Sequence, residues 1–474
     1  MRHKLPLILG FDGKTLDRET IKHLDEINPV GLILFKRNLG TAEEIHQLIR
    51  EIKDLLGDVI LSIDHEGGLV NRFGPQFAVP PAAYSLQFTA GSTQKQGAQL
   101  LAALPAHFGF NLNFAPVVDL HHQGGSIGSR AFCESPQRVK AWGELSVAAH
   151  EAVGVGACLK HFPGHGRVSL DSHQSEVTLD SSLEELLGLD LVPYIDSAAP
   201  VVMASHVLYP ELDPQLPASL SKRILKDLLK GQLGYPGLVV TDCLEMNALD
   251  KYSPTQMVDL GIEAELDLWV SSFSLKKSRA FQRELAARLR EKLPGTGNPK
   301  IGSFLKTYQP KKTALPALEQ AIRLRSEVIQ KQGELSGGPL ALVRLGGSTN
   351  LKVNQGESSD SFCDAMVKFC PDITEVTAIP WEDIELISEK FVQWRNEGRL
   401  VLVACDHEKL SINRSAVLEK LAKGAKLLHL NLGDNVDLME PQGPKWQCFG
   451  SDCLTAQAIC SQLNLRLNQS LAGT

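Results

Sequence analysis

The chain has 474 residues, a length that suits two or three domains better than one. Hydrophobic residues make up 43% and charged residues 22%, which is typical of a soluble globular protein. The net charge of −7 argues against nucleic acid or an anionic membrane surface as the main partner. A neutral or acidic small molecule remains open as the ligand.

The cysteine content and the first residues of the chain indicate the cellular compartment in which the protein is expected. The nine cysteines are thinly spread and form no Cys-x-x-Cys pair, which argues against zinc ribbons and thioredoxin-like sites. Free thiols in a reducing compartment fit best, so we expect a cytoplasmic protein. The basic residues 1–4 and the apolar residues 5–10 could open a secretory signal, but the run is short and lacks a cleavage site. We interpret it as a first strand. No stretch approaches the roughly 20 apolar residues of a membrane span.

Short apolar runs alternate with longer amphipathic stretches through the first two thirds of the chain. The runs are Leu5–Gly10, Val30–Phe35, Val59–Asp64, Phe110–Val117, Val155–His161, Pro200–His206, Gly237–Asp242 and Leu266–Ser271. Continuously apolar runs are typical of parallel strands buried on both faces. Helices are predicted between them, for example over Ala42–Leu56 and Leu220–Gly231. The alternation predicts an α/β fold, a (β/α)8 TIM-like barrel, with a doubly wound open sheet as the alternative.

A change of pattern follows the eighth run. Leu293–Pro299 and Tyr308–Pro316 resemble linkers, and the segment Ala317–Gln332 between them and the next strands has a helical pattern. Four more strand-like runs then occur, at Leu340–Leu345, Ile373–Ala378, Leu400–Cys405 and Lys426–Leu432. We predict a catalytic barrel over residues 1–300, a linker and helix over 301–335, and a smaller α/β sandwich domain over 336–474.

The stretch from Lys160 to His173 is the most informative in the chain. It contains three histidines, a lysine and an aspartate within fourteen residues, interleaved with proline and glycine. It begins at the end of the fifth predicted strand, and the active site of a barrel lies at the C-terminal ends of its strands. This pattern predicts a polar loop over a pocket. The alternative is a solvated loop that happens to be rich in histidine.

Two further carboxylates directly follow predicted strands. Asp242 closes the seventh apolar run and would lie at the barrel mouth, although an aspartate that caps the next helix is an equal alternative. Asp64 closes the third run and is followed by Gly67-Gly68 and Arg72. The glycines allow a tight turn, so that Asp64 and Arg72 could both face a ligand. Each of these signals is weak when taken alone.

Together these stretches resemble the family 3 glycoside hydrolases, and specifically their bacterial β-N-acetylhexosaminidase branch. Residues 160–173 fit the pattern K-H-F/Y-P-G-H/D-G-x4-D-S/T-H of that branch at every defined position. Supporting matches are Ile127–Phe132, Val202–His206 and Pro217–Ser221. The resemblance runs from about Leu5 to residue 275, and it implies a barrel with the active site at its mouth.

The resemblance also implies an activity. The enzyme would be a retaining exo-β-N-acetylhexosaminidase that removes terminal N-acetylglucosamine through a covalent glycosyl-enzyme, without a metal or other cofactor. Asp242 would be the nucleophile, His173 the acid/base and Asp171 the carboxylate that orients His173. The implied sugar-binding residues are Asp64, Arg72, Arg130, Lys160, His161 and His206. His206 could equally be a structural histidine under the rim. Peptidoglycan turnover fragments are the implied substrate, with chitin oligosaccharides as the alternative.

The chain departs from the family pattern at several positions. The family usually shows Gln-Glu-Gly-Gly-Arg-Val-Gln-Arg, where this chain has His65, Leu69 and Asn71, and Leu69 lacks a charge near the sugar site. Cys243 follows the nucleophile where a second aspartate is frequent. The sequence leaves open an N-acetylglucosaminide phosphorylase, a β-glucosidase of the same family, a metal-dependent amidohydrolase and a non-catalytic sugar-binding barrel.

Overall fold

The structure, a computed structural model, describes residues 3–328 apart from 75, 124, 169–176, 273–278 and 296. Beyond them it describes residue 393 and the backbone of six strands. The chain divides into two units, one formed by Met1–Gly74 with Gln94–Pro316 and the other by Pro75–Thr93 with Ala317–Thr474. The two units are described separately below.

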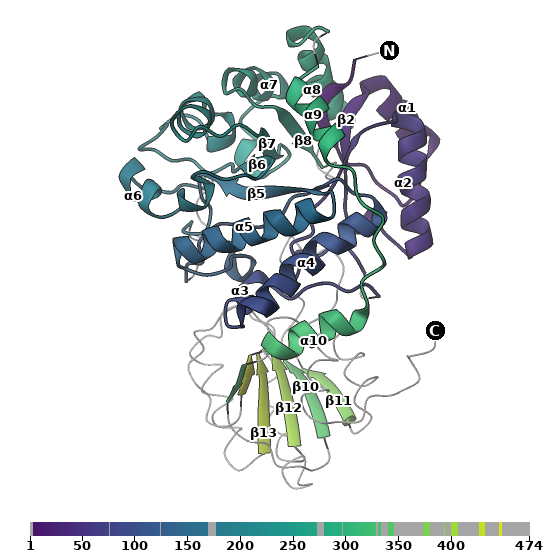
Figure 1. Ribbon diagram of the computed structural model, residues 1–474, viewed down its shortest axis with the longest axis vertical. Helices are drawn as coiled ribbons and strands as arrows, with labels where there is room; N and C mark the ends of the chain where they lie inside the picture. The colour runs from purple at the N-terminus through teal and green to yellow at the C-terminus, as the bar shows by residue number, and fades with distance from the viewer. Residues whose placement is uncertain are drawn as a thin grey trace. The chain divides into compact units, whose positions relative to one another are not determined.

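Eight strands close into a barrel in the first unit (Figure 1). They are β1 (Leu5–Leu9), β2 (Pro29–Leu34), β3 (Ile60–Ile63), β4 (Leu112–Asn113), β5 (Gly156–Phe162), β6 (Val201–Ala204), β7 (Leu238–Cys243) and β8 (Leu268–Ser271). Each strand pairs in parallel with the next, and β8 pairs in parallel with β1, which closes the ring. The predicted (β/α)8 barrel is therefore confirmed, and the barrel is closed rather than an open doubly wound sheet.

Helices lie between the strands and around the barrel. The longer ones in this unit are α1 (Arg18–Ile27), α2 (Ala42–Leu56), α4 (Gly91–Phe108), α5 (Pro136–Ala152), η5 (Arg223–Gln232), α7 (Pro254–Glu263), α8 (Arg279–Lys292) and α9 (Pro299–Thr307). The shorter ones are η1 (Lys36–Asn38), η2 (Gly128–Arg130), α6 (Leu183–Gly188), η3 (Val192–Tyr194), η4 (Ala218–Leu220) and η6 (Asn247–Leu249). Helix η5 is wound as a π-helix.

Helix α2 illustrates how the local sequence specifies these elements. The Thr41 hydroxyl accepts the N–H of Glu44 at 3.3 Å, and the Glu44 carboxylate accepts the N–H of Thr41 at 2.8 Å. This reciprocal pair satisfies two backbone donors that the first turn of a helix leaves unpaired. The helix then buries the apolar residues Ile45, Leu48, Ile49, Ile52 and Leu56. Their spacing of three and four residues places them on the single face that covers the barrel.

The fourth strand is shorter than the sequence predicts. Regular pairing covers Leu112–Asn113 rather than Phe110–Val117. One cause is Pro116, which has no N–H to donate to a neighbouring strand. The chain nevertheless continues beside β5, because the N–H of Val118 donates to the Lys160 carbonyl at 2.9 Å. The segment therefore still leads to the barrel mouth.

Helix α9 contributes to the barrel core. Ile301 and Phe304, which are 6% and 4% exposed, belong to the same apolar cluster as residues of the barrel strands. At Gly156, the first residue of β5, a Cβ atom would lie only 2.6 Å from the Phe304 ring. Glycine at this position therefore allows the close approach of the helix. The helix begins beside residue 300, where we predict the barrel domain to end, and the domain boundaries remain a prediction.

The second unit contains a six-stranded sheet and two described helices. The strands are β9 (Gln330–Gln332), β10 (Leu340–Leu345), β11 (Ile373–Ile379), β12 (Leu400–Cys405), β13 (Lys426–Asn431) and β14 (Lys445–Gln447), in the order β11-β10-β12-β13-β14-β9. All neighbours are parallel except β9, which is antiparallel to β14. The two helices are α3 (Ala83–Leu86) and α10 (Leu318–Val328). A mostly parallel sheet agrees with the predicted smaller α/β domain. Within the described part of the chain, no helix is long and apolar enough to cross a membrane.

Two fully buried histidines flank Asn113 in the barrel. The Asn113 amide donates to the His65 carbonyl at 2.9 Å and lies 3.1 Å from His150 Nε2. His150 Nδ1 lies 2.7 Å from the Ser146 carbonyl, which can only accept, so Nδ1 carries the proton and Nε2 accepts. Burial lowers the pKa of His65 to about 3 and that of His150 to about 4. Both imidazoles are therefore neutral in the folded protein.

This pair predicts acid sensitivity of the fold. Because the pKa values of His65 and His150 are lowered from 6.5, the unfolded chain binds more protons below about pH 6.5. The contribution of the two neutral histidines to the free energy of unfolding is therefore complete above that pH. Towards pH 4 it falls by about 1.4 kcal/mol per pH unit for each histidine. Between pH 7 and pH 5, we expect the free energy of unfolding of His65→Gln to fall by about 2 kcal/mol less than that of the wild type, as measured by urea unfolding. His122→Gln, at an exposed position, is the matched control. Equal losses in His65→Gln and wild type would contradict the prediction.

Candidate active site

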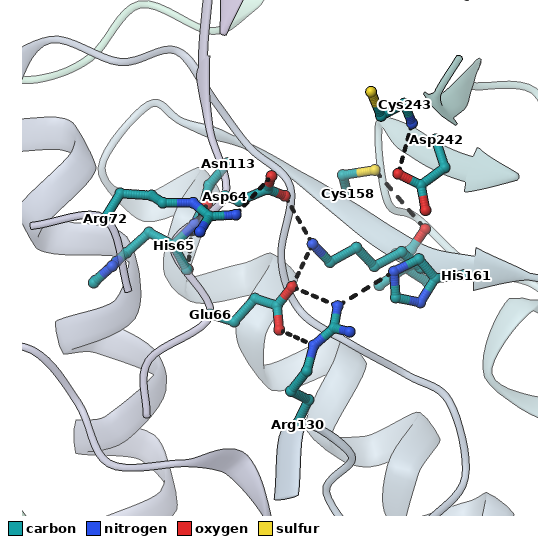
Figure 2. A network of polar contacts seen from close by, with 12 residues as sticks. Asp64, His65, Glu66, Arg72, Asn113, Arg130, Cys158, His161, Asp242 and Cys243 are labelled. Carbon is teal, nitrogen blue, oxygen red and sulfur yellow. Dashed lines mark hydrogen bonds and ion pairs between the residues drawn. The ribbon is translucent and has the colours of Figure 1, made fainter. Parts of the chain in front are cut away.

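The proposed site residues lie at the C-terminal ends of the barrel strands. Asp64 directly follows β3, Lys160 and His161 belong to β5, His206 lies just after β6, and Asp242 belongs to β7. Because all eight strands are parallel, these ends meet at one face of the barrel. Figure 2 shows side chains from separate strands gathered there. The structure thus brings together residues that are up to 178 positions apart (242 − 64).

An ion-pair network forms one side of the site (Figure 2). Lys160 Nζ lies 2.9 Å from Asp64 Oδ1 and 2.5 Å from Glu66 Oε1. Arg130 binds Glu66 through two parallel contacts, from Nε at 2.8 Å and from Nη2 at 2.9 Å. Arg72 Nη2 lies 3.4 Å from Asp64 Oδ2. Three cations therefore share two carboxylates, which leaves one net positive charge in the network (3 − 2).

The environment keeps the inner members of this network charged. Burial would raise the pKa of Glu66, but the positive charges of Arg130 and Lys160 hold it well below its usual range. Burial would lower the pKa of Lys160, but Asp64 and Glu66 raise it above its usual value. The side chains of Lys160 and Glu66 are 3% and 5% exposed, whereas those of Arg72, Asp64 and Arg130 are 14–20% exposed. The three outer side chains are therefore open to a ligand.

Asp119 fixes the orientation of His161. Its Oδ2 atom lies 2.6 Å from His161 Nδ1, and its Oδ1 atom accepts the backbone N–H of His165 at 2.7 Å. Because Nδ1 donates to the carboxylate, neutral His161 presents Nε2 as an acceptor, 3.4 Å from Arg130 Nη2. Burial would raise the pKa of Asp119, but His161 and the donors around it lower that pKa below its usual value. Asp119 is thus an ionised anchor for the first residues of the His-rich loop.

We expect Asp119→Asn to lower kcat/KM for a glycoside substrate by about ten- to a hundredfold, because an amide group facing His161 Nδ1 would favour the wrong tautomer. Kinetics across pH 5–9, together with the melting temperature, would measure this effect. Ser126→Ala is the matched control, since Ser126 contacts His165 Nδ1 at 2.9 Å in the same loop but not His161. A variant with wild-type kcat/KM at every pH would show that the Asp119 carboxylate does not matter for His161.

Asp242 is partly exposed at the mouth and carries an ionised carboxylate. Its Oδ1 atom accepts the N–H of Cys243 at 2.7 Å (Figure 2). Burial would raise the pKa of Asp242, but the nearby His161 and His206, the Cys243 N–H and Lys160 together lower it below its usual value. A carboxylate that is both ionised and oriented is suited to attack an electrophilic carbon.

His206 contacts the protein through both ring nitrogens. Nε2 lies 2.9 Å from the Cys243 carbonyl, which can only accept, so Nε2 carries the proton. In the neutral form of the ring, Nδ1 accepts the Ser219 hydroxyl at 2.7 Å. The ring is 5% exposed. This geometry favours the structural interpretation of His206 that the sequence leaves open beside sugar binding.

Asp171 and His173 lie outside the described residues, and the chain on either side of them is held in place. On the near side, Arg167 Nη2 donates to Asp190 Oδ2 at 2.7 Å and Nη1 to Glu185 Oε1 at 2.6 Å. On the far side, Thr178 forms a parallel bridge with Leu208. Both flanks of the proposed acid/base segment are thus fixed to the rest of the barrel.

The departures at positions 65 and 69 lie in a tight hairpin after β3. Gly67 and Gly68 adopt φ values of +81° and +50°, which side chains rarely tolerate, so the paired glycines make the turn. His65 is fully buried and packs edge-on against Phe73 with ring centroids 5.0 Å apart. Leu69 is half-buried. Position 65 is therefore a core position, whereas position 69 retains some exposure.

The structure adds two residues that the sequence analysis did not select. Glu66 lies two residues after Asp64 in the sequence. A second acidic residue so close to a candidate sugar-binding residue does not by itself predict a role, and its importance becomes visible only through its partners Arg130 and Lys160. Asp119 follows the apolar residues 117–118, which is the same strand-then-carboxylate signal that marked Asp242. That signal could have identified Asp119.

The histidines at the barrel mouth bind different partners. His161 contacts Asp119, and His206 contacts Ser219 and a backbone carbonyl. In the described residues, no group of three or more His, Cys, Asp and Glu side chains is arranged to hold a metal ion.

Known proteins similar to this chain include bacterial enzymes. A protein named beta-hexosaminidase from Xanthomonas campestris pv. campestris (strain B100) is 37% identical over 253 residues, which covers 51% of this chain and 76% of the relative. A protein of the same name from Stenotrophomonas maltophilia (strain R551-3) is also 37% identical over 253 residues, covering 51% and 75%. The similarity therefore spans about half of this chain and three quarters of each relative.

Solved structures show the same architecture. A glycoside hydrolase family 3 β-N-acetylglucosaminidase from Paenibacillus sp. str. FPU-7 superposes with a TM-score of 0.83 at 24% identity, over 98% of this chain and 96% of that one. NagZ from Neisseria gonorrhoeae, in complex with N-trifluoroacetyl-D-glucosamine, superposes with a TM-score of 0.57 at 27% identity, over 68% and 93%. The first comparison extends the shared fold to nearly the whole chain.

The family match covers the barrel. Residues 7–285 match the glycosyl hydrolase family 3 N terminal domain, which is 279 of 474 residues (285 − 7 + 1) and includes all or most of each barrel strand. The residues gathered at the barrel mouth lie within this range. The chain therefore belongs to glycosyl hydrolase family 3.

Proposed function

We propose that the protein is a retaining exo-β-N-acetylhexosaminidase that removes terminal N-acetylglucosamine from an oligosaccharide. The observation that carries the proposal is the position of the Asp242 carboxylate in β7, at the mouth of a family 3 barrel and beside His161 and Lys160. The relatives named beta-hexosaminidase support an acetamido sugar as the substrate, as does the ligand of gonococcal NagZ.

We assign the nucleophile to Asp242. Its carboxylate attacks the anomeric carbon, the bond to the leaving oxygen breaks, and a covalent glycosyl-enzyme forms. Water then cleaves that ester from the opposite face, so that the anomeric configuration is retained overall. The lowered pKa keeps the carboxylate ionised, and the Cys243 N–H orients it before the substrate arrives.

We assign the acid/base role to His173 and the orienting role to Asp171. An imidazole titrates near neutral pH with little perturbation, so it can give a proton to the departing oxygen and then accept one from water. A carboxylate two residues away is well placed in sequence to stabilise the imidazolium form. The assignment rests on the fourteen-residue motif, whose first residues Lys160 and His161 lie beside Asp242 in the site.

We assign sugar binding to the ion-pair network and His161. Asp64, Arg72 and Arg130 are partly open to solvent and offer charge-assisted hydrogen bonds to ring hydroxyls. Lys160 and His161 lie deeper and are placed to contact the sugar nearer to Asp242. The net positive charge of the network would also stabilise the carboxylate nucleophile.

Hydrolysis of p-nitrophenyl N-acetyl-β-D-glucosaminide beside the corresponding glucoside tests the proposal. We expect kcat/KM to be at least about a hundredfold higher for the acetamido sugar, with the β-anomer as the first product. A sugar 1-phosphate formed when phosphate is added would show a phosphorylase instead. Preference for the glucoside would show a β-glucosidase, and no turnover of either substrate would favour a non-catalytic barrel.

For the natural substrate we propose a peptidoglycan turnover fragment, in which N-acetylglucosamine is linked to a muramic acid. We also propose a cytoplasmic location, because the free thiols of Cys133, Cys158 and Cys243 suit a reducing compartment. Comparing the release of N-acetylglucosamine from a muropeptide disaccharide and from chitobiose tests the choice. Higher kcat/KM for chitobiose would make chitin oligosaccharides the better assignment.

A further inference from the structure

A buried carboxylate lies three residues beyond Asp242. Glu245 is 6% exposed and belongs to the loop that follows β7. Its Oε1 atom accepts the Ser271 hydroxyl at 3.2 Å, and its Oε2 atom accepts the Ser272 hydroxyl at 2.9 Å. Ser271 is the last residue of β8, so Glu245 ties the end of β7 to the end of β8.

Glu245 also contacts the residue that orients Asp242. Its Oε2 atom accepts the Cys243 thiol at 3.5 Å, and the thiol sulfur lies 2.8 Å from the Ser272 hydroxyl. Burial and the negative charge of Glu245 raise the pKa of the Cys243 thiol to about 12. The thiol is therefore a neutral donor at physiological pH, and it belongs to the residue whose backbone N–H binds Asp242.

Cys243 is thus held at three points. Its thiol is bound by Glu245, its carbonyl accepts His206 Nε2 at 2.9 Å, and its N–H donates to Asp242 Oδ1 at 2.7 Å. The direction of that N–H sets the plane of the Asp242 carboxylate. A residue fixed through both side chain and carbonyl has little freedom to rotate its N–H, so Asp242 is preorganised.

We infer that Glu245 is a positioning residue for the nucleophile, acting through the Cys243 thiol and the Ser271–Ser272 hydroxyls. This inference rests on the proposed function, because it assumes that Asp242 attacks the sugar. The charged and titratable groups that face Glu245, Cys243 and Asp242 come from four parts of the barrel: Arg37 after β2, Lys160 and His161 in β5, His206 after β6 and Asp242 itself in β7. Arg37 lies near enough to Glu245 and Cys243 for its positive charge to offset part of the negative charge of Glu245.

The first test is the kinetics of Glu245→Gln on p-nitrophenyl N-acetyl-β-D-glucosaminide. The amide keeps the size of the side chain but loses the charge and half of the acceptor capacity. We expect kcat to fall about tenfold with KM within about twofold, since attack, rather than binding, depends on the orientation of Asp242. Glu263→Gln, at an exposed position on α7, is the matched control and should retain wild-type kcat. A Glu245→Gln kcat within twofold of wild type would overturn the inference.

A double-mutant cycle with Cys243→Ala identifies the route of the effect. If Glu245 acts through the thiol, Glu245→Gln should cost no more than about threefold in kcat once the thiol is absent. An undiminished tenfold loss in the Cys243→Ala background would contradict the stated route. Melting temperatures of all four proteins check that the kcat changes do not follow a loss of folded protein.

A third measurement does not depend on turnover. Removing the charge of Glu245 should lower the pKa of the Cys243 thiol, so Cys243 should react with iodoacetamide about three to ten times faster at pH 8.5. Mass spectrometry of the peptide that contains Cys243 distinguishes it from the other cysteines. If the wild type proves inactive on the glycoside, the proposed function fails, whereas an unchanged alkylation rate at Cys243 would overturn the Glu245 inference itself.

Discussion

Replacement of Asp242 by alanine is expected to lower kcat by about a thousandfold or more while leaving the fold intact. The carboxylate forms the bond to the anomeric carbon, and no neighbouring group replaces it in the described site. Asp242 is partly exposed, and its carboxylate accepts a hydrogen bond from the N–H of the adjacent Cys243. Loss of this carboxylate should therefore cost little stability. Steady-state kinetics and the melting temperature measure the two effects.

Azide distinguishes a missing nucleophile from a disturbed site. In Asp242→Ala, a small anion can enter the vacated space and attack from the same face, which should restore turnover and yield the glycosyl azide of α configuration. Asp250→Ala, which removes an exposed carboxylate from the segment that follows β7, is the matched control and should behave as wild type. A residual rate above about a tenth of wild type in Asp242→Ala would refute the nucleophile assignment, because loss of a covalent nucleophile costs orders of magnitude.

The barrel was predictable from the sequence because its strands are buried on both faces. Such strands leave continuous apolar runs, and the run at Val155–His161 corresponds closely to β5 at Gly156–Phe162. The short strands β9 and β14, with the sequences QKQ and KWQ, have no such run and could not be recognised by hydrophobicity. The helix predicted over Ala317–Gln332 is therefore too long at its C-terminal end: α10 ends at Val328, and residues Gln330–Gln332 form β9.

Helix α9 lies between the two stretches that resemble linkers, and no helix is predicted there although the sequence contains helix signals. Asn298 caps the helix by accepting the N–H of Lys300 at 2.9 Å, and Pro299 occupies the first helical position, where a missing N–H costs nothing. Glycine and proline in Leu293–Pro299 outweighed these signals. The apolar residues of α9 fill the barrel core, which is a tertiary contact that a local pattern does not reveal.

The candidate site likewise contains some residues that the sequence reveals and others that only the fold reveals. Carboxylates directly after apolar strands, such as Asp64 and Asp242, could be selected because strand ends converge in a parallel barrel. The supporting residues could not, because their importance lies in partners that are distant in sequence. Asp119 contacts a histidine 42 residues away, and Glu245 contacts Ser271 across 26 residues. Only the folded chain shows these pairings.

Replacement of His173 by alanine is expected to affect substrates according to their leaving groups. A poor leaving group needs a proton in the transition state, whereas an activated nitrophenolate departs with little help. We therefore expect His173→Ala to slow the first step for a natural disaccharide by about a hundredfold or more and to affect that step far less for the nitrophenyl glycoside. With the nitrophenyl substrate the glycosyl-enzyme should accumulate, because the same imidazole is needed to activate water.

Asp171→Ala provides the matched comparison, since Asp171 would act only through His173. It should show the same selectivity to a smaller degree, with a shifted pH optimum, because loss of a neighbouring negative charge lowers the pKa of an imidazole. The measurement is the ratio of first-step rates for the two substrates in each variant, obtained from pre-steady-state bursts and from mass spectrometry of the adduct on Asp242. If His173→Ala slows that step equally for both substrates, His173 is a binding or structural residue. The proton donor must then come from another histidine at the barrel mouth, and His161 is the better candidate, because its Nε2 atom faces the site while both nitrogens of His206 are engaged by the protein.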